Sequence, residues 1–391
     1  MKRALFILFV FGGPMLGFAQ VSGGGSQFSG VLSANLIDDF NSNTAYSDNN
    51  NGYTYFQLNG SFKDGPFGLE SQFQFGPSPG AGVQNLYIHY GYGYANLFGG
   101  VLYLAVGRVV DLSTFGLNSY YQQSPNGPGV YGTGVGKIGS SGFGVDGIQL
   151  KIIPAANLVF GVVMPYNILG FPIVNSTFRA TKITASYTIP KVVQVVLGYQ
   201  QHLVGVADYV AAPQPPALFD PNGLLNKNKA YVLANLLVSE NLTAGVRYEL
   251  DHDVSAVEII SHNLYATVGD KIGNFSIGAD AGVYIPPGGS AGLEVLGATS
   301  YTFPAALPSV DIQPYVQAGF FTSGYPLVSD LTGVSYTNGF TNDNFFTVNP
   351  QLKFLLGKSQ HELELGYTLT YDLNAGQIIL DQFNVMMQIY F

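Results

Sequence analysis

Apolar and polar side chains alternate with a period of two residues over several long stretches of the chain. In the clearest stretch, 242–251, one row reads Leu, Ala, Val, Tyr, Leu and the other reads Thr, Gly, Arg, Glu, Asp. The stretches 275–285 and 346–354 repeat the pattern. Successive side chains of a β-strand point to opposite faces of the sheet. Each stretch therefore predicts a strand with one apolar face and one polar face.

The same alternation recurs along the chain and predicts about 18 strands, with about 16 as the alternative. Each candidate covers about 9 to 12 residues, the length that a tilted strand needs to cross a bilayer. The Gly-rich stretch 90–94 blurs the pattern, because register is weakly specified where glycine is abundant. The expected strand centres are Leu32, Leu58, Phe73, Tyr87, Leu104, Leu150, Val162, Ala185, Val195, Leu233, Val246, Leu264, Ala279, Leu296, Val316, Val348, Leu365 and Val385.

The expected connections alternate between long and short. Long segments follow odd-numbered strands, at 39–52, 111–143, 165–178, 201–228 and 322–344. Tight turns follow even-numbered strands, at 63–66, 154–157, 189–191, 239–241 and 357–360. Short turns on one rim and long external loops on the other are typical of transmembrane β-barrels. Lipid offers no hydrogen-bond partner to a free strand edge, so the first strand must pair with the last.

The composition describes a chain with little charge to place on its surface. Hydrophobic residues make up 47% of it and charged residues 10%, whereas an average soluble domain has about 25% charged residues. Lipid is a solvent that suits such a surface. The net charge of −9 argues against a basic footprint for nucleic acid. The absence of cysteine excludes disulfides and thiolate metal sites.

The first residues have the form of a secretory signal. Lys2 and Arg3 precede the apolar run 4–11, and Ala19 provides a small residue at an expected cleavage position. We expect residues 1–19 to be a signal peptide for export to the periplasm, and residues 20–391 to form a single transmembrane β-barrel domain. No later stretch approaches the roughly 18 apolar residues of a spanning helix, so strands must make any membrane span.

The last ten residues carry an apolar row that ends in an aromatic residue, Phe383, Val385, Met387, Ile389 and Phe391. This segment resembles the last strand of bacterial outer-membrane β-barrels of the porin type. The resemblance implies an all-β, antiparallel up-and-down barrel in the cell outer membrane, in contact with lipid and lipopolysaccharide. It also implies recognition of the terminal row by the barrel-assembly machinery and assembly as a homotrimer.

A second likeness concerns the expected fifth strand, which ends in Gly107-Arg108. In porins that this chain resembles, a Gly-Arg pair near the end of the fifth strand precedes an external loop that folds into the lumen and narrows it. The resemblance thus implies that segment 111–143 is an inward-folded constriction loop. The acidic motif usual in that loop is not visible here.

Polar rows that face a water-filled lumen would set its selectivity through their charges. We expect passive diffusion of small hydrophilic solutes and ions, with a modest cation preference from the excess of acidic residues. Tyr120 and Tyr121 could present aromatic faces to a sugar, or pack a loop against the wall. Each wall charge could also be an ordinary solvated residue. The expected wall charges are Glu70, Arg108, Lys151, Lys182, Arg247, Glu249, Asp280 and Lys353, with Asp111, Lys137 and Asp146 at the constriction.

No motif supports catalysis or a bound cofactor. Segment 132–137 resembles a phosphate-binding loop, but Tyr131 and Ile138 replace its first glycine and its metal-binding hydroxyl. The histidines lack zinc-ligand spacing, and no serine lies in a Gly-x-Ser-x-Gly elbow. We therefore expect no enzyme, metal site or cofactor. Two alternatives remain: a non-conducting surface adhesin or structural barrel, and a lipid-acting barrel enzyme whose site only the fold would assemble.

Overall fold

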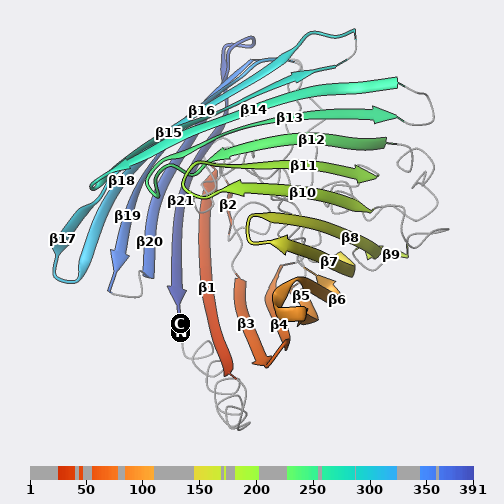
Figure 1. The fold of residues 1–391 in the computed structure, drawn as a ribbon. Helices are drawn as coiled ribbons and strands as arrows, with labels where there is room; N and C mark the ends of the chain where they lie inside the picture. Colours follow the sequence, from red (N-terminus) through yellow and green to blue (C-terminus); the bar gives the residue numbers. More distant parts are fainter. Residues whose placement is uncertain are drawn as a thin grey trace.

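The structure is a computed structural model of the chain. It describes residues 25–39, 44–46, 55–77, 84–109, 145–168, 171–172, 181–201, 227–253, 258–286, 288–323, 344–357 and 361–391. These residues form a single sheet of 21 strands and one short 3₁₀ turn, η1 (Phe98–Gly100). Figure 1 shows the strands following one another in chain order around one curved sheet. No helix in the described ranges is long and apolar enough to cross a membrane.

Three of the 21 strands are short and pair antiparallel with one end of a longer strand: β2 (Thr44–Tyr46) with β1, β9 (Phe171–Pro172) with β8, and β17 (Phe303–Leu307) with β18. The other eighteen pair antiparallel with their neighbours in chain order. They are β1 (Gly25–Asp39), β3 (Tyr55–Asp64), β4 (Phe67–Pro77), β5 (Gln84–Leu97), β6 (Leu102–Val109), β7 (Val145–Ala155), β8 (Leu158–Ile168), β10 (Lys182–Ile189), β11 (Val193–Gln201), β12 (Lys227–Leu236), β13 (Thr243–Asp253), β14 (Glu258–Ile272), β15 (Phe275–Ile285), β16 (Gly292–Tyr301), β18 (Val310–Phe321), β19 (Phe345–Leu356), β20 (His361–Asp372) and β21 (Gln377–Tyr390).

The strand pairings return to their starting point. β1 pairs with β3 on one edge and with β21 on the other, where the register runs from Val31 opposite Tyr390 to Asp39 opposite Gln382. Each of the expected strand centres lies in one of the eighteen strands, and no strand holds two of them. The predicted all-β, antiparallel up-and-down barrel is confirmed, in its eighteen-strand form rather than with sixteen strands.

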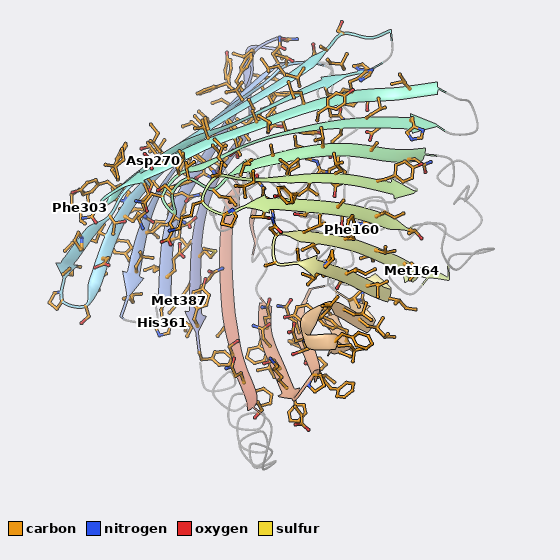
Figure 2. All side chains as sticks on the ribbon, viewed as in Figure 1. Phe160, Met164, Asp270, Phe303, His361 and Met387 are labelled. Carbon is orange, nitrogen blue, oxygen red and sulfur yellow. The ribbon has the colours of Figure 1, made fainter. Side chains whose placement is uncertain are left out.

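The two faces of the sheet have opposite polarity. In β13 and β15, Val246 and Ile277 are 53% and 49% exposed, whereas Arg247 and Asp280 on the other face are 2% and 1% exposed. We call the exposed apolar row of each strand its outward row and the alternate row its inner row. Phe160 and Met164, which Figure 2 labels, belong to the outward row of β8. A soluble protein buries its large apolar side chains; a transmembrane barrel turns them to lipid.

Connections at one rim are tight, as expected. Two-residue turns at 65–66 and 156–157 join β3 to β4 and β7 to β8, and a three-residue turn at 190–192 joins β10 to β11. Gly65 has a φ of 56° in the first of these turns, a conformation that glycine adopts without strain. The expected constriction loop 111–143 and the expected signal peptide lie outside the described residues.

Candidate functional site on the inner wall

One charged cluster on the inner wall is centred on Arg247. Arg247 and Glu249 are two residues apart on β13, so both belong to its inner row, where they form an ion pair. Arg247 Cζ lies 4.0 Å from the centre of the Tyr231 ring on β12. An aromatic face attracts a guanidinium electrostatically, so the ring and the carboxylate together hold the Arg247 side chain in place. Arg247 and Glu249 are 2% and 0% exposed.

A second cluster is centred on Lys353 of β19. Its Nζ lies 3.1 Å from Glu362 Oε1 and 3.0 Å from Glu364 Oε2, both on β20. The pairing of β19 with β20 sets these contacts, because it places Lys353 directly opposite Glu364. Nζ also lies 5.3 Å from the centre of the Tyr315 ring on β18. One ammonium thus serves two carboxylates, which leaves the cluster with an excess of negative charge.

Hydrogen bonds hold further carboxylates of the inner wall. Asp280 Oδ1 on β15 accepts from Thr267 Oγ1 on β14 at 2.5 Å, and the two residues are directly opposite in the register. Asp251 Oδ2 accepts from Ser261 Oγ at 3.0 Å and from Asn263 Nδ2 at 3.2 Å. On the inner rows from β13 to β20, carboxylates outnumber the two buried cations Arg247 and Lys353. These carboxylates are Glu249, Asp251, Asp280, Glu294, Glu362, Glu364 and Asp372.

The strands β4 to β10 place three more of the expected wall charges on inner rows. Glu70 lies on the inner row of β4 and accepts a hydrogen bond from the Tyr92 hydroxyl. Lys151 lies opposite Tyr103 in the pairing of β6 with β7, and Lys182 shares the inner row of β10 with the buried Thr184. Inner-row placement therefore holds for seven of the expected wall charges, the three here together with Arg247, Glu249, Asp280 and Lys353.

Arg108 does not share that placement. In β6, Ala105 and Val109 are fully buried on the inner row, whereas Val106 is 49% exposed on the outward row. Arg108 is two residues from Val106, so the alternation places it on the outward row, opposite Asp146 in the pairing with β7. The expectation that Arg108 lines the lumen is corrected. The Gly-Arg likeness predicted the end of the strand, but it did not predict the face of the sheet on which Arg108 lies.

Four of the expected constriction residues, Asp111, Tyr120, Tyr121 and Lys137, lie outside the described residues. Conversely, Glu294, Glu362 and Glu364 were not among the expected wall charges, although the alternation of Glu with Leu in the β20 segment was a visible signal. Within the part of the chain that the structure describes, no group of three or more His, Cys, Asp or Glu side chains is arranged to hold a metal ion.

The terminal apolar row lies on the outward side of β21. Phe383, Met387 and Phe391 are 38%, 43% and 59% exposed, while Met386 and Gln388 between them are buried on the inner row. Figure 2 labels Met387 on this strand. The row therefore belongs to the same apolar surface as the outward rows of the other strands.

The fold is similar to those of solved outer-membrane proteins of Pseudomonas aeruginosa. The outer membrane protein OpdK is 12% identical, with a TM-score of 0.56 over 94% of this chain and 98% of that one. OpdL is 12% identical (TM-score 0.54; 95% and 99% covered) and OprD is 9% identical (TM-score 0.55; 95% and 97% covered). No protein-family model and no curated protein matches the sequence. This chain has the fold of porin-type outer-membrane β-barrels.

Proposed function

We propose that this protein is a channel of the outer membrane through which small hydrophilic solutes and ions diffuse passively. The observation that carries the proposal is the inverted polarity of the eighteen-strand ring, with apolar rows outside and polar rows inside. Barrels of about 16 to 18 strands leave an aqueous channel rather than a core filled by side chains. The likeness to outer-membrane proteins supports the location, with lipid on the outer surface and solutes within.

The inner wall favours cations. Carboxylates outnumber Arg247 and Lys353 on the inner rows from β13 to β20, and wall charge attracts counter-ions into a pore. This agrees with the acidic balance of the whole chain. We assign the modest cation preference expected from the sequence to the arc of wall that holds Asp280 and Glu294.

The test is conductance of the purified protein in a planar bilayer under a salt gradient. We expect discrete channel openings and a reversal potential of the sign for cation preference. Neutralisation of the inner-row carboxylate in Asp280→Asn should move the reversal potential toward zero. Asp270→Asn is the matched control, because Asp270 lies on the other face beside the β14–β15 turn (Figure 2). A folded barrel without openings would instead be an adhesin or scaffold, and clear anion preference would overturn the charge assignment.

We retain segment 111–143 as the constriction loop, with Asp111 and Lys137 as its charges and Tyr120 and Tyr121 as its aromatic contacts. Asp146, which was also expected at the constriction, is not retained, because it belongs to β7 and lies opposite Arg108 in the pairing with β6. Deletion of the central part of this segment should enlarge the single-channel conductance. Unchanged conductance and unchanged size exclusion would remove the loop from this role. The homotrimer also belongs to the proposal, and light scattering of the detergent-solubilised protein would test it against a monomer.

A further inference from the structure

A β-bulge turns a run of tyrosines into the barrel. In the pairing of β4 with β5, Phe73 is opposite Ile88 but Gln72 is opposite Tyr90, so His89 is an extra residue. Before the bulge, Ile88 lies on the outward row and is 45% exposed. After it, the face reverses, and Tyr90 shares the inner row with Gln72. Bulges often re-aim side chains next to functional sites.

The tyrosines of β5 continue onto β6 as a contiguous aromatic strip, consisting of Tyr90, Tyr92, Tyr94 and Tyr103. The ring centres of Tyr90 and Tyr92 are 6.0 Å apart, and those of Tyr92 and Tyr94 are 6.4 Å apart. Tyr94 stacks on Tyr103 with centres 5.7 Å apart and an interplanar angle of 26°. Tyr92 is buried at the base of the strip, whereas Tyr90, Tyr94 and Tyr103 are partly exposed.

One glycine makes room for the Tyr94 ring on the wall, and a second allows two strand backbones to approach closely beside Tyr92. A Cβ at Gly68, opposite Tyr94, would lie 2.2 Å from the ring of Tyr94. A Cβ at Gly107, opposite Tyr92, would lie 2.6 Å from the carbonyl oxygen of Gly91, and Gly107 has a φ of 130°. The Tyr94 ring therefore lies over backbone that carries no side chain.

Groups that exchange hydrogen bonds flank the strip. The Tyr92 hydroxyl donates to Glu70 Oε2 at 2.5 Å. On the other side, Lys151 Nζ lies 5.4 Å from the centre of the Tyr103 ring. The strip thus has a carboxylate and an ammonium beside it, which provide acceptors and donors without a net charge. In strand order it lies about halfway round the ring from the arc of wall that holds Asp280 on β15 and Glu294 on β16.

We propose that Tyr90, Tyr94 and Tyr103 form a stacking track for neutral sugar rings inside the channel. The apolar C–H face of a pyranose packs on a flat aromatic face, while its hydroxyls need the donors and acceptors that Glu70 and Lys151 supply. Several weak contacts in series allow a solute to enter and to leave, as conduction requires. This inference rests on the proposed channel function and adds a solute class to it.

The test combines sugar block of single-channel current with magnetisation transfer to the sugar in detergent. Maltose should interrupt the current of the wild type and receive magnetisation at its C–H protons. In Tyr94→Leu/Tyr103→Leu, which retains apolar bulk without a flat ring, maltose block should be about tenfold weaker. Tyr94→Phe/Tyr103→Phe keeps the rings and should keep the block. Tyr187→Leu is the matched control, because Tyr187 is on the outward row and 48% exposed.

The outcomes separate this inference from the channel function. Channel openings without maltose block, or block that survives the leucine variant, overturn the track alone. Block by an aromatic solute such as benzyl alcohol but not by maltose overturns the sugar class. A complete absence of openings overturns the channel, and magnetisation transfer to maltose then still decides whether the track binds sugar.

Discussion

The ring of the C-terminal residue Phe391 lies over Gly30 of the first strand, where a Cβ on residue 30 would come within 2.3 Å of Phe391 Cζ. The Gly30 N–H donates to the Phe391 carbonyl oxygen at 2.9 Å, and the Phe391 N–H donates to the Gly30 carbonyl oxygen at 3.1 Å. Beyond Gly30, the ring of Phe391 stacks on Phe56 of β3, with centres 5.8 Å apart. The last residue thus spans the first strand where the ring of strands joins.

Substitution of Gly30 by alanine should weaken this seam. The added methyl would meet both the Phe391 ring and the backbone oxygen of Gln57, 2.6 Å away, so the strand or the ring must move. Overpacking of this kind costs about 1 to 3 kcal/mol, which urea unfolding in lipid vesicles would measure. Gly297→Ala is the control, because the nearest atom to a Cβ there is 3.9 Å away. Equal midpoints for the two variants would contradict the role of Gly30.

Variants of Phe391 and of its stacking partner Phe56 distinguish an effect on assembly of the barrel in cells from an effect on its stability. If the barrel-assembly machinery reads the terminal aromatic residue, Phe391→Ala should lower the amount of folded protein in the outer membrane of expressing cells. Phe56→Leu removes the stacking partner but leaves the terminal residue in place, so it should lower stability in vitro and spare assembly. Immunoblots of outer membranes, compared with refolding yields in vesicles, would show this. Similar cellular levels for both variants would argue against the terminal signal.

The strands could be predicted from the sequence because their signal is local. A residue such as Val246 and its neighbour Arg247 meet two different solvents, and the alternation between them marks a strand without any knowledge of its partners. The face of the sheet to which a side chain belongs was harder to predict from the sequence. The bulge at His89 reverses the face of the following tyrosines, and only the register with β4 reveals it. Arg108 was assigned to the wrong face because a likeness, rather than the alternation with Val106, located it.

The contacts within the charged clusters could not be predicted, because they depend on how strands pair. Lys353 was an expected wall charge, yet its partners Glu362 and Glu364 follow from the register of β19 against β20. Arg247 and Glu249 are neighbours on one strand, and their shared row was visible in the sequence. The contact of Arg247 with the Tyr231 ring could not be seen in the sequence, because Tyr231 comes from another strand, β12.

Removal of the cation in Lys353→Met should leave two buried carboxylates, Glu362 and Glu364, without their ammonium partner. Loss of one side of a buried ion pair costs about 3 to 5 kcal/mol. The triple variant with Glu362→Gln and Glu364→Gln should recover much of this loss, because the uncompensated charge is then gone. Urea unfolding would measure both, with Lys271→Met as the control, because Lys271 is an exposed lysine near the end of β14. A triple variant no more stable than the single one would contradict the charge argument.

Arg108 and Lys182 should differ in their effect on ion selectivity. Arg108 lies on the outward row of β6, so Arg108→Leu should leave conductance and reversal potential unchanged. Lys182 lies on the inner row of β10, and Lys182→Leu removes a positive charge from the wall. Its reversal potential should therefore shift toward stronger cation preference. The same planar-bilayer measurement decides both, and a shift with Arg108→Leu would return that residue to the lumen.

A charged residue on an outward row should lower the free energy of unfolding by an amount that depends on its depth in the bilayer. Val246 lies near the middle of β13 and is 53% exposed, whereas Ile285 is the last residue of β15 and 43% exposed. An arginine facing lipid costs about 2 to 4 kcal/mol at the midplane and about 0 to 1 kcal/mol near the interface. Val246→Arg should therefore lower the unfolding free energy in vesicles much more than Ile285→Arg does. If water covered these rows, both substitutions would change the unfolding free energy by no more than about 0.5 kcal/mol. That result would contradict the assignment of the outward rows to lipid.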